Sequence, residues 1–164
     1  MNPSWYALYT RGRHEKLIHS ELGKRGIGSF LPMRSIRRRW SDRVVTLEDP
    51  LFKSYLFVQT GLEHFADVLR IKGAVRFVTF SGKPTSVPGS VIDSLRTLVD
   101  SELAVDPFPY LKSGDRVNVR SGILKGIEGF IVRKDEKKCR LVVSIDAIMS
   151  SISVEVDACL VDKS

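Results

Sequence analysis

The sequence predicts an α+β protein built of two modules, and three observations support this prediction. Helical and strand-like segments alternate over the first part of the chain, only short β-rich segments follow residue 111, and an aperiodic stretch with Pro107 and Pro109 separates the two parts. We therefore expect a first domain at residues 1–103, a linker at 104–110 and a second domain at 111–164. The chain of 164 residues is 43% hydrophobic, which is enough for two small folded cores.

The first module is expected to be a mixed β-sheet flanked by helices. Its strand-like segments are short and aromatic or β-branched, whereas its helical segments repeat apolar residues every three to four positions. The expected strands are residues 5–9, 29–31, 51–59 and 74–80, and the expected helices are residues 13–25, 63–70 and a segment that starts at Ser90. Because helices recur between strands, we expect them to cover one face of the sheet.

A two-stranded hairpin is expected within residues 33–49, where two segments flank a Ser41-Asp42 turn. Near its tip lie three adjacent cations and one indole: Arg37, Arg38, Arg39 and Trp40. Adjacent like charges repel one another and gain little from folding, while an indole offers a plane on which a base can stack. We expect this tip to bind nucleic acid, and a solvated face that only aids solubility is the alternative.

The second module is expected to be a small barrel of five short strands. Its expected strands are residues 115–120, 129–134, 140–145, 151–156 and 158–161. Gly122, Gly126 and Gly129 lie between the first two strands. They predict a compact turn, because glycine adopts backbone angles that other residues avoid.

Positive charge is concentrated in one part of the chain. The whole chain has a net charge of +7, and residues 11–43 alone hold ten arginines and lysines against three acids, an excess of the same size. Guanidinium groups dominate this excess, and they suit bidentate contacts with phosphate. A polyanionic partner is favoured, and its binding should depend on salt and little on base sequence. A basic protein without such a partner is the alternative.

The sequence offers no sign of catalysis, a metal site or a membrane span. His14 and His19 do not share a helical face as i, i+4 partners would, and the glycine turn lacks the Gly-Lys-Ser/Thr of a phosphate loop. Cys139 and Cys159 show no metal-ligand spacing, so we expect two reduced thiols. We expect no enzyme activity and no cofactor, and we expect a cytoplasmic monomer with no membrane partner.

Four motifs, in order along the chain, resemble the NusG family of transcription factors. They are the Trp5–Tyr9 strand with its basic helix, the aromatic Leu51–Val58 segment after Asp49-Pro50, the Gly73–Val78 and Val87-Pro88 segments, and the glycine turn, which resembles a KOW motif. The resemblance implies a NusG N-terminal (NGN-like) domain followed by an SH3-like five-stranded KOW barrel. Length and linker are more similar to specialised paralogues such as RfaH than to housekeeping NusG. Lys53 departs from the family, which usually has proline there.

The resemblance also implies a protein-binding site on the first module. In the family an aromatic pocket binds the clamp of the largest RNA polymerase subunit, and the matching residues here are Tyr9, Phe52 and Tyr55. Large buried aromatic contacts are typical of binding hot spots. The alternative is that these rings only fill the core of the sheet.

Further contacts are implied for nucleic acid and for the barrel. Residues that match family contacts to non-template or upstream DNA are Arg11, Arg13, Lys16, Lys72 and Arg76. The barrel would bind Rho or the ribosomal protein NusE. Exposure at a turn suggests Ile123, Leu124 and Phe130 for that contact, and the loop at residues 146–151 is the alternative. Some relatives refold this module into helices. Here, β-branched residues with period two in the 140–145 and 151–156 strands favour a stable barrel.

Together these observations predict a transcription elongation factor that binds RNA polymerase, suppresses pausing and promotes antitermination. A ribosome-associated RNA-binding protein that acts through its KOW-like barrel is the alternative. That alternative explains the charge and the glycines, but it leaves the aromatic segment of the first module without a role.

Overall fold

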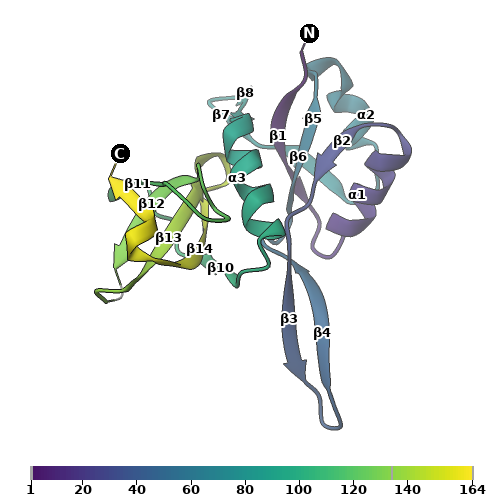
Figure 1. Ribbon diagram of the computed structural model, residues 1–164. Coiled ribbons are helices and arrows are strands. Elements are labelled where there is room, and N and C mark those ends of the chain that lie inside the picture. Colours follow the sequence, from purple (N-terminus) through teal and green to yellow (C-terminus); the bar gives the residue numbers. More distant parts are fainter. Residues whose placement is uncertain (1, 134, 164) are drawn as a thin grey trace. The chain divides into compact units, whose positions relative to one another are not determined.

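The computed structural model describes residues 2–133 and 135–163, which form two compact units (Figure 1). One unit comprises residues 2–32 and 52–91, and the other comprises residues 33–51 and 92–163. This division places the hairpin and most of the third helix in the same unit as the C-terminal strands. The domain boundaries at residues 103 and 111 therefore stay a prediction.

The sheet of the first unit is antiparallel at every pair of neighbouring strands that is described. Its strands are β1 (Ser4–Thr10), β2 (Gly28–Phe30), β5 (Tyr55–Thr60), β6 (Ala74–Phe77) and β9 (Ser86–Val87). They run in the order β2-β5-β1-β6, and β9 also pairs with β1. The predicted mixed sheet is therefore wrong.

The reason is that each helical crossover skips one strand. The helix α1 (Glu15–Lys24) connects β1 to β2, but β5 lies between them. Likewise η1 (Leu62–His64) and α2 (Phe65–Leu69) connect β5 to β6 across β1. This is the split β-α-β arrangement, in which parallel strands never become direct neighbours.

Both helices cover one face of this sheet. Side chains from α1 and α2 pack with alternate residues of the strands in one buried cluster: Leu8, Ile18, Leu22, Leu56, Val58, Val68, Ile71 and Phe77. Figure 1 shows α1 and α2 on the same side of the strands. Because strand side chains alternate between faces, the residues between these core positions point to the opposite face.

The predicted hairpin is present as a long two-stranded ribbon, visible in Figure 1. Strands β3 (Met33–Arg39) and β4 (Val44–Pro50) pair in register from Met33↔Pro50 to Arg39↔Val44. The amide of Trp40 donates to the carbonyl of Arg43 at 2.8 Å and closes the turn. A second, very short hairpin, β7 (Thr79–Phe80) with β8 (Lys83–Pro84), follows β6.

The second module forms a sheet of six strands, four of which lie where strands were expected, while the last begins later than expected. Its strands are β10 (Val105–Phe108), β11 (Asp115–Val119), β12 (Glu128–Arg133), β13 (Lys138–Ile145), β14 (Ser150–Asp157) and β15 (Val161–Lys163), which follow the helix α3 (Gly89–Asp100). Their order is β10-β14-β13-β12-β11-β15. The extra strand β10 comes from the predicted linker, whose residues 105–108 pair with β14. Pro107 fits there because β10 ends this order of strands, and an edge strand needs no second set of donors.

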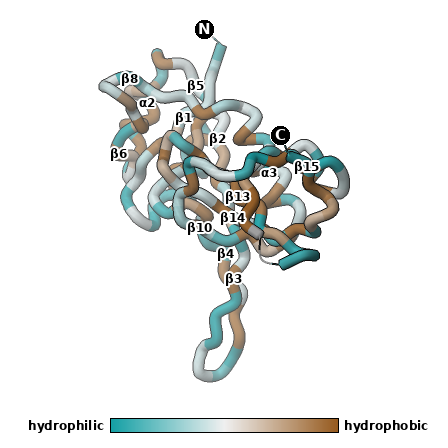
Figure 2. The backbone as a smooth tube through the Cα atoms, turned by 90° about the vertical axis from the view of Figure 1, so that its left-hand side faces the viewer, coloured by the Kyte–Doolittle hydropathy of each residue, from teal (hydrophilic) through white to brown (hydrophobic). Residues whose placement is uncertain are grey.

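The core of this six-stranded sheet is apolar and built mainly on two strands. Leu141, Val142, Ile152 and Val154 of β13 and β14 are at most 1% exposed. Figure 2 shows hydrophobic residues gathered along these two strands. Between β14 and β15 lies a short helix, η3 (Ala158–Leu160), where the last strand was expected to begin.

Two glycines of the turn before β12 have a left-handed backbone. Gly122 and Gly126 have φ angles of 88° and 92°, in the left-handed region that favours glycine. Gly129 is required for another reason, because a Cβ there would lie 2.5 Å from the carbonyl oxygen of Val142 on β13. Neither cysteine is in a disulfide, and Cys139 is buried while Cys159 is exposed. No helix among the described residues is both long and apolar enough to cross a bilayer.

We predict that Gly129→Ala destabilises the six-stranded sheet by about 2 kcal/mol, because its Cβ would press on a backbone carbonyl that cannot rotate away. Gly126→Ala, which meets no atom within 4 Å, should cost only about 1 kcal/mol of backbone strain. Amide hydrogen exchange in β12 and β13 measures both values. Equal effects of the two substitutions would contradict the close approach at Gly129.

Candidate functional site

Two tyrosines and an arginine form a row across three strands of the first sheet. Tyr9 of β1 faces Tyr55 of β5 in the strand register and faces Arg76 of β6 on its other side. The tyrosine ring centroids are 5.4 Å apart and tilted by 56°. The Arg76 guanidinium carbon lies 5.3 Å from the centroid of the Tyr9 ring. The register therefore builds a cation–π contact and an aromatic pair side by side.

This row lies on the sheet face that α1 and α2 do not cover. Leu8 and Leu56 belong to the core beneath the helices, so their neighbours Tyr9 and Tyr55 point the other way. Both tyrosines are half-buried, while Arg76 is exposed. The rings thus keep part of their surface available for contact with another molecule.

Phe52 differs from the two tyrosines, because it is buried. It is 5% exposed and packs edge-to-face on Phe57 with 6.1 Å between ring centroids. Phe57 is fully buried and also stacks on Phe30 at 6.4 Å. The core-filling alternative therefore describes Phe52, which offers little surface of its own.

Cations surround one end of the tyrosine row. The Arg11 amide donates to the Gly73 carbonyl, and the Thr10 amide donates to the Ser54 carbonyl, both at 2.8 Å. These bonds bring the ends of β1, β5 and β6 together. The exposed cations that result are Arg11, Arg13, Lys72 and Arg76, and Lys16 is exposed on α1. Within residues 2–133 and 135–163, the first four have no ion-pair partner, so their charges are available to an anion.

The loop before α1 has an unusual backbone. Arg13 adopts φ 66°, which costs a non-glycine residue on the order of 1 kcal/mol. Its amide donates at 2.9 Å to Oε1 of Glu15, a side chain only 6% exposed. The His14 ring packs against Gly73, where a Cβ would lie 2.7 Å from it. Sequence reasoning missed this arrangement, because no local pattern marks a left-handed arginine.

The predicted nucleic-acid residues of the hairpin belong to the other unit. Arg37, Arg38 and Arg39 are exposed and have no ion-pair partner among the described residues. Trp40 is 48% exposed, and the Arg43 guanidinium carbon lies 5.6 Å from its ring centroid. The tip therefore presents cations beside an accessible indole, as the sequence predicts.

The three barrel residues proposed for a partner differ in exposure. Ile123 is 65% exposed, but Leu124 is 4% exposed and belongs to the core. Phe130 is half-buried beneath Arg116, whose guanidinium carbon lies 5.8 Å from the ring centroid. Met149, which is 70% exposed at φ 46°, adds a second accessible apolar side chain. Ile123 and Phe130 remain candidates, whereas Leu124 offers no surface.

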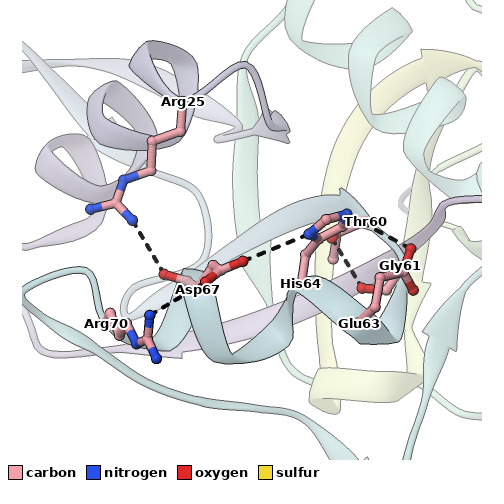
Figure 3. Close-up of polar contacts among 7 residues, drawn as sticks. All are labelled: Arg25, Thr60, Gly61, Glu63, His64, Asp67 and Arg70. Atoms are coloured by element: carbon pink, nitrogen blue, oxygen red, sulfur yellow. Dashed lines mark hydrogen bonds and ion pairs between the residues drawn. The ribbon is translucent and has the colours of Figure 1, made fainter.

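A second polar cluster, missed by sequence reasoning, lies where β5 ends and η1 begins (Figure 3). His64 lies between Glu63 and Asp67, with nitrogen–oxygen distances of 3.8 and 3.7 Å. Arg70 pairs with the Asp67 carboxylate at 3.6 Å, and Arg25 donates to the Asp67 carbonyl at 3.4 Å. A cavity of about 590 Å³ adjoins these residues. None of the described residues form a cluster suited to a metal ion.

Comparison with known proteins identifies the family. Residues 3–96, more than half of the chain, match the family model described as transcription termination factor NusG. The transcription termination/antitermination protein NusG of Borreliella burgdorferi is 20% identical, over 96% of this chain and 96% of its own length. The NusG of Rickettsia bellii is 22% identical over 97% of this chain and 89% of its own.

A solved structure shares the fold. The structure of Thermotoga maritima NusG matches with a TM-score of 0.60 at 21% identity and covers 99% of this chain and 98% of the other. The family match, the near full-length relatives and the shared fold agree with the motifs found in the sequence. The chain belongs to the NusG family, whose members act in transcription and its termination and antitermination.

Proposed function

We propose that this protein is a transcription elongation factor that binds RNA polymerase, suppresses pausing and promotes antitermination. The observation that carries the proposal is the row of Tyr55, Tyr9 and Arg76. It places two half-buried rings beside exposed cations on one end of a rigid sheet. In the family this end binds the clamp of the largest polymerase subunit.

The tyrosine row has the chemistry of a binding hot spot. Tyrosine offers a large, stiff contact surface and a hydroxyl that stays hydrogen-bonded at the edge of an interface. The pair is held in place by strand register and by the contact between the two rings, so little side-chain entropy is lost on docking. A protruding apolar helix tip is the partner that such a surface fits.

The cations next to the row would hold nucleic acid. The phosphates of the non-template strand would be contacted by the cations near the row: Arg11, Arg13, Lys16, Lys72 and Arg76. Upstream DNA would be contacted by the tip residues Arg37–Trp40. Arg11, Arg13, Lys72 and Arg76 have no ion pair among the described residues, so they give none up when phosphate arrives. Such contacts add affinity with little sequence information, which suits a protein that travels with a polymerase.

The mechanism would be a shift in population. A protein that binds the closed, elongating polymerase better than the paused form favours the closed form by its difference in affinity. The barrel would bind a second partner, Rho or NusE, with Ile123 and Phe130 as contacts.

We predict that Tyr9→Ala together with Tyr55→Ala weakens binding to core RNA polymerase by roughly thirtyfold or more, as loss of an aromatic hot spot does. The melting temperature should change little, because both rings are only half-buried. Leu17→Ala is the control, since Leu17 is 45% exposed on the helix that covers the other face. Phe52→Ala should instead destabilise the protein by about 3 kcal/mol. Biolayer interferometry and thermal melts measure the two effects.

Normal binding by the double tyrosine variant would contradict the assigned site. Binding of the wild-type protein to ribosomal subunits, with none to polymerase, would favour the ribosomal alternative.

In a purified transcription system, the wild-type protein should shorten pauses and raise readthrough of a terminator. The double tyrosine variant should do neither at the same concentration, because it is not recruited. Full readthrough of the terminator by that variant would show that antitermination does not depend on the tyrosine row.

We further predict that Arg37→Ala, Arg38→Ala and Arg39→Ala combined weaken binding of duplex DNA. The slope of log affinity against log salt should fall by about 2–3, since each arginine that is removed leaves one phosphate without its cation. Polymerase affinity without DNA should stay as in the wild type. An unchanged salt slope would indicate that the tip is a solvated face.

A further inference from the structure

The loop before α1 keeps an arginine where backbone geometry favours glycine. Arg13 adopts φ 66°, whereas its neighbour Gly12 does not have a left-handed backbone. If this turn served the fold alone, the glycine would be expected one residue later. The strain at Arg13 therefore points to a role for its side chain.

Glu15 is the structural partner of that strained residue. It is the one charged side chain that is buried among the described residues, at 6% exposure, and it forms no ion pair there. Its Oε1 accepts a hydrogen bond from the Arg13 amide at 2.9 Å. The first turn of a helix favours a carboxylate, which helps to offset the burial of its charge.

The loop is also held against the loop that carries Lys72. The Arg11 amide donates to the Gly73 carbonyl at 2.8 Å, and the His14 ring occupies the space where a Gly73 side chain would lie. Nδ1 of His14 is 3.0 Å from the Gly12 carbonyl. Two basic loops from distant parts of the chain thus form one fixed surface.

We propose that Glu15 is a positioning residue that holds Arg13 in its left-handed conformation, so that the Arg13 guanidinium joins Arg11 and Lys72 in one phosphate-binding cluster. This inference rests on the proposed binding of nucleic acid and names the structural device behind it. By turning inward, Glu15 also removes the acid of this loop from the path of a phosphate. The ligand is the sugar–phosphate backbone of a single DNA strand.

Three variants of the full chain separate hydrogen bonding from charge. Glu15→Gln keeps the length and an acceptor oxygen but loses the charge, whereas Glu15→Asp keeps the charge but shortens the reach. Arg13→Gly removes the cation and relieves the strain. Lys24→Ala is the matched control, because Lys24 is an exposed cation at the far end of α1 that pairs with Glu21.

Binding of a labelled single-stranded DNA of mixed sequence is measured by fluorescence anisotropy over a range of salt concentrations. Duplex DNA and RNA of the same sequence are tested for comparison. We expect Glu15→Gln to bind within about twofold of wild type. Glu15→Asp and Arg13→Gly should each weaken binding roughly three- to tenfold and lower the salt slope by about 1, the change expected when one phosphate is no longer bound. The double variant Glu15→Asp plus Arg13→Gly should bind no more weakly than either single variant, since both substitutions act on the contact with one phosphate.

The thermal stability of Arg13→Gly should change in the opposite direction to its DNA affinity. Arg13→Gly should raise the melting temperature while it weakens DNA binding, because it removes backbone strain and a functional cation together. In the wild-type protein the Arg13 amide should exchange slowly with solvent, because it donates to a buried carboxylate. Exchange as fast as that of an unstructured peptide would overturn the proposal without any variant.

The outcomes separate this inference from the function beneath it. If the wild-type protein binds no nucleic acid even at low salt, the proposed function fails. If it binds but Glu15→Asp matches wild type while Glu15→Gln binds more tightly, charge alone matters and the positioning role is wrong. Additive losses of affinity in the double variant would also overturn it. Equal affinity for single strands, duplex and RNA would keep the cluster but contradict the preference for a single DNA strand.

Discussion

The antiparallel pairing of β1 with both β5 and β6 is the constraint on which the candidate site depends. Register alone places Tyr9 opposite Tyr55 and opposite Arg76, so three residues far apart in sequence become neighbours. A slip of β1 by one residue would turn Tyr9 toward the helices and expose Leu8 instead. The apolar core under α1 and α2 therefore fixes the composition of the opposite face. The alternation of side chains along each strand thus supplies the apolar core on one face and the binding residues on the other.

Much of the first unit could be predicted from local patterns, whereas the strand neighbours could not. The helix at 15–24, the hairpin and the aromatic strand at 55–60 all lie within or close to predicted segments. The mixed sheet was wrong, because periodicity does not reveal that each crossover passes over a strand. Phe52 was grouped with Tyr9 and Tyr55, but only packing on Phe57 shows that it is buried.

Local sequence patterns also predicted only part of the second module. Its glycine turn follows from residue type, because few other residues adopt the backbone angles of Gly122 and Gly126. Pro107 and Pro109 made residues 104–110 resemble a linker. Proline is nevertheless tolerated on an edge strand, and residues 105–108 pair with β14. Leu124 was expected to be exposed at a turn, but its side chain folds into the core while that of Ile123 points outward. Adjacent turn residues differ in this way only through tertiary contacts.

The two cysteines have a practical consequence. The chain holds two in total; Cys139 is buried on β13, and Cys159 is exposed in η3. A thiol reacts only where reagent can reach it. A maleimide dye added to the unmodified protein should therefore attach at a single point on the barrel. The native sequence is already suited to fluorescence studies of how this module moves, without engineering to remove competing thiols.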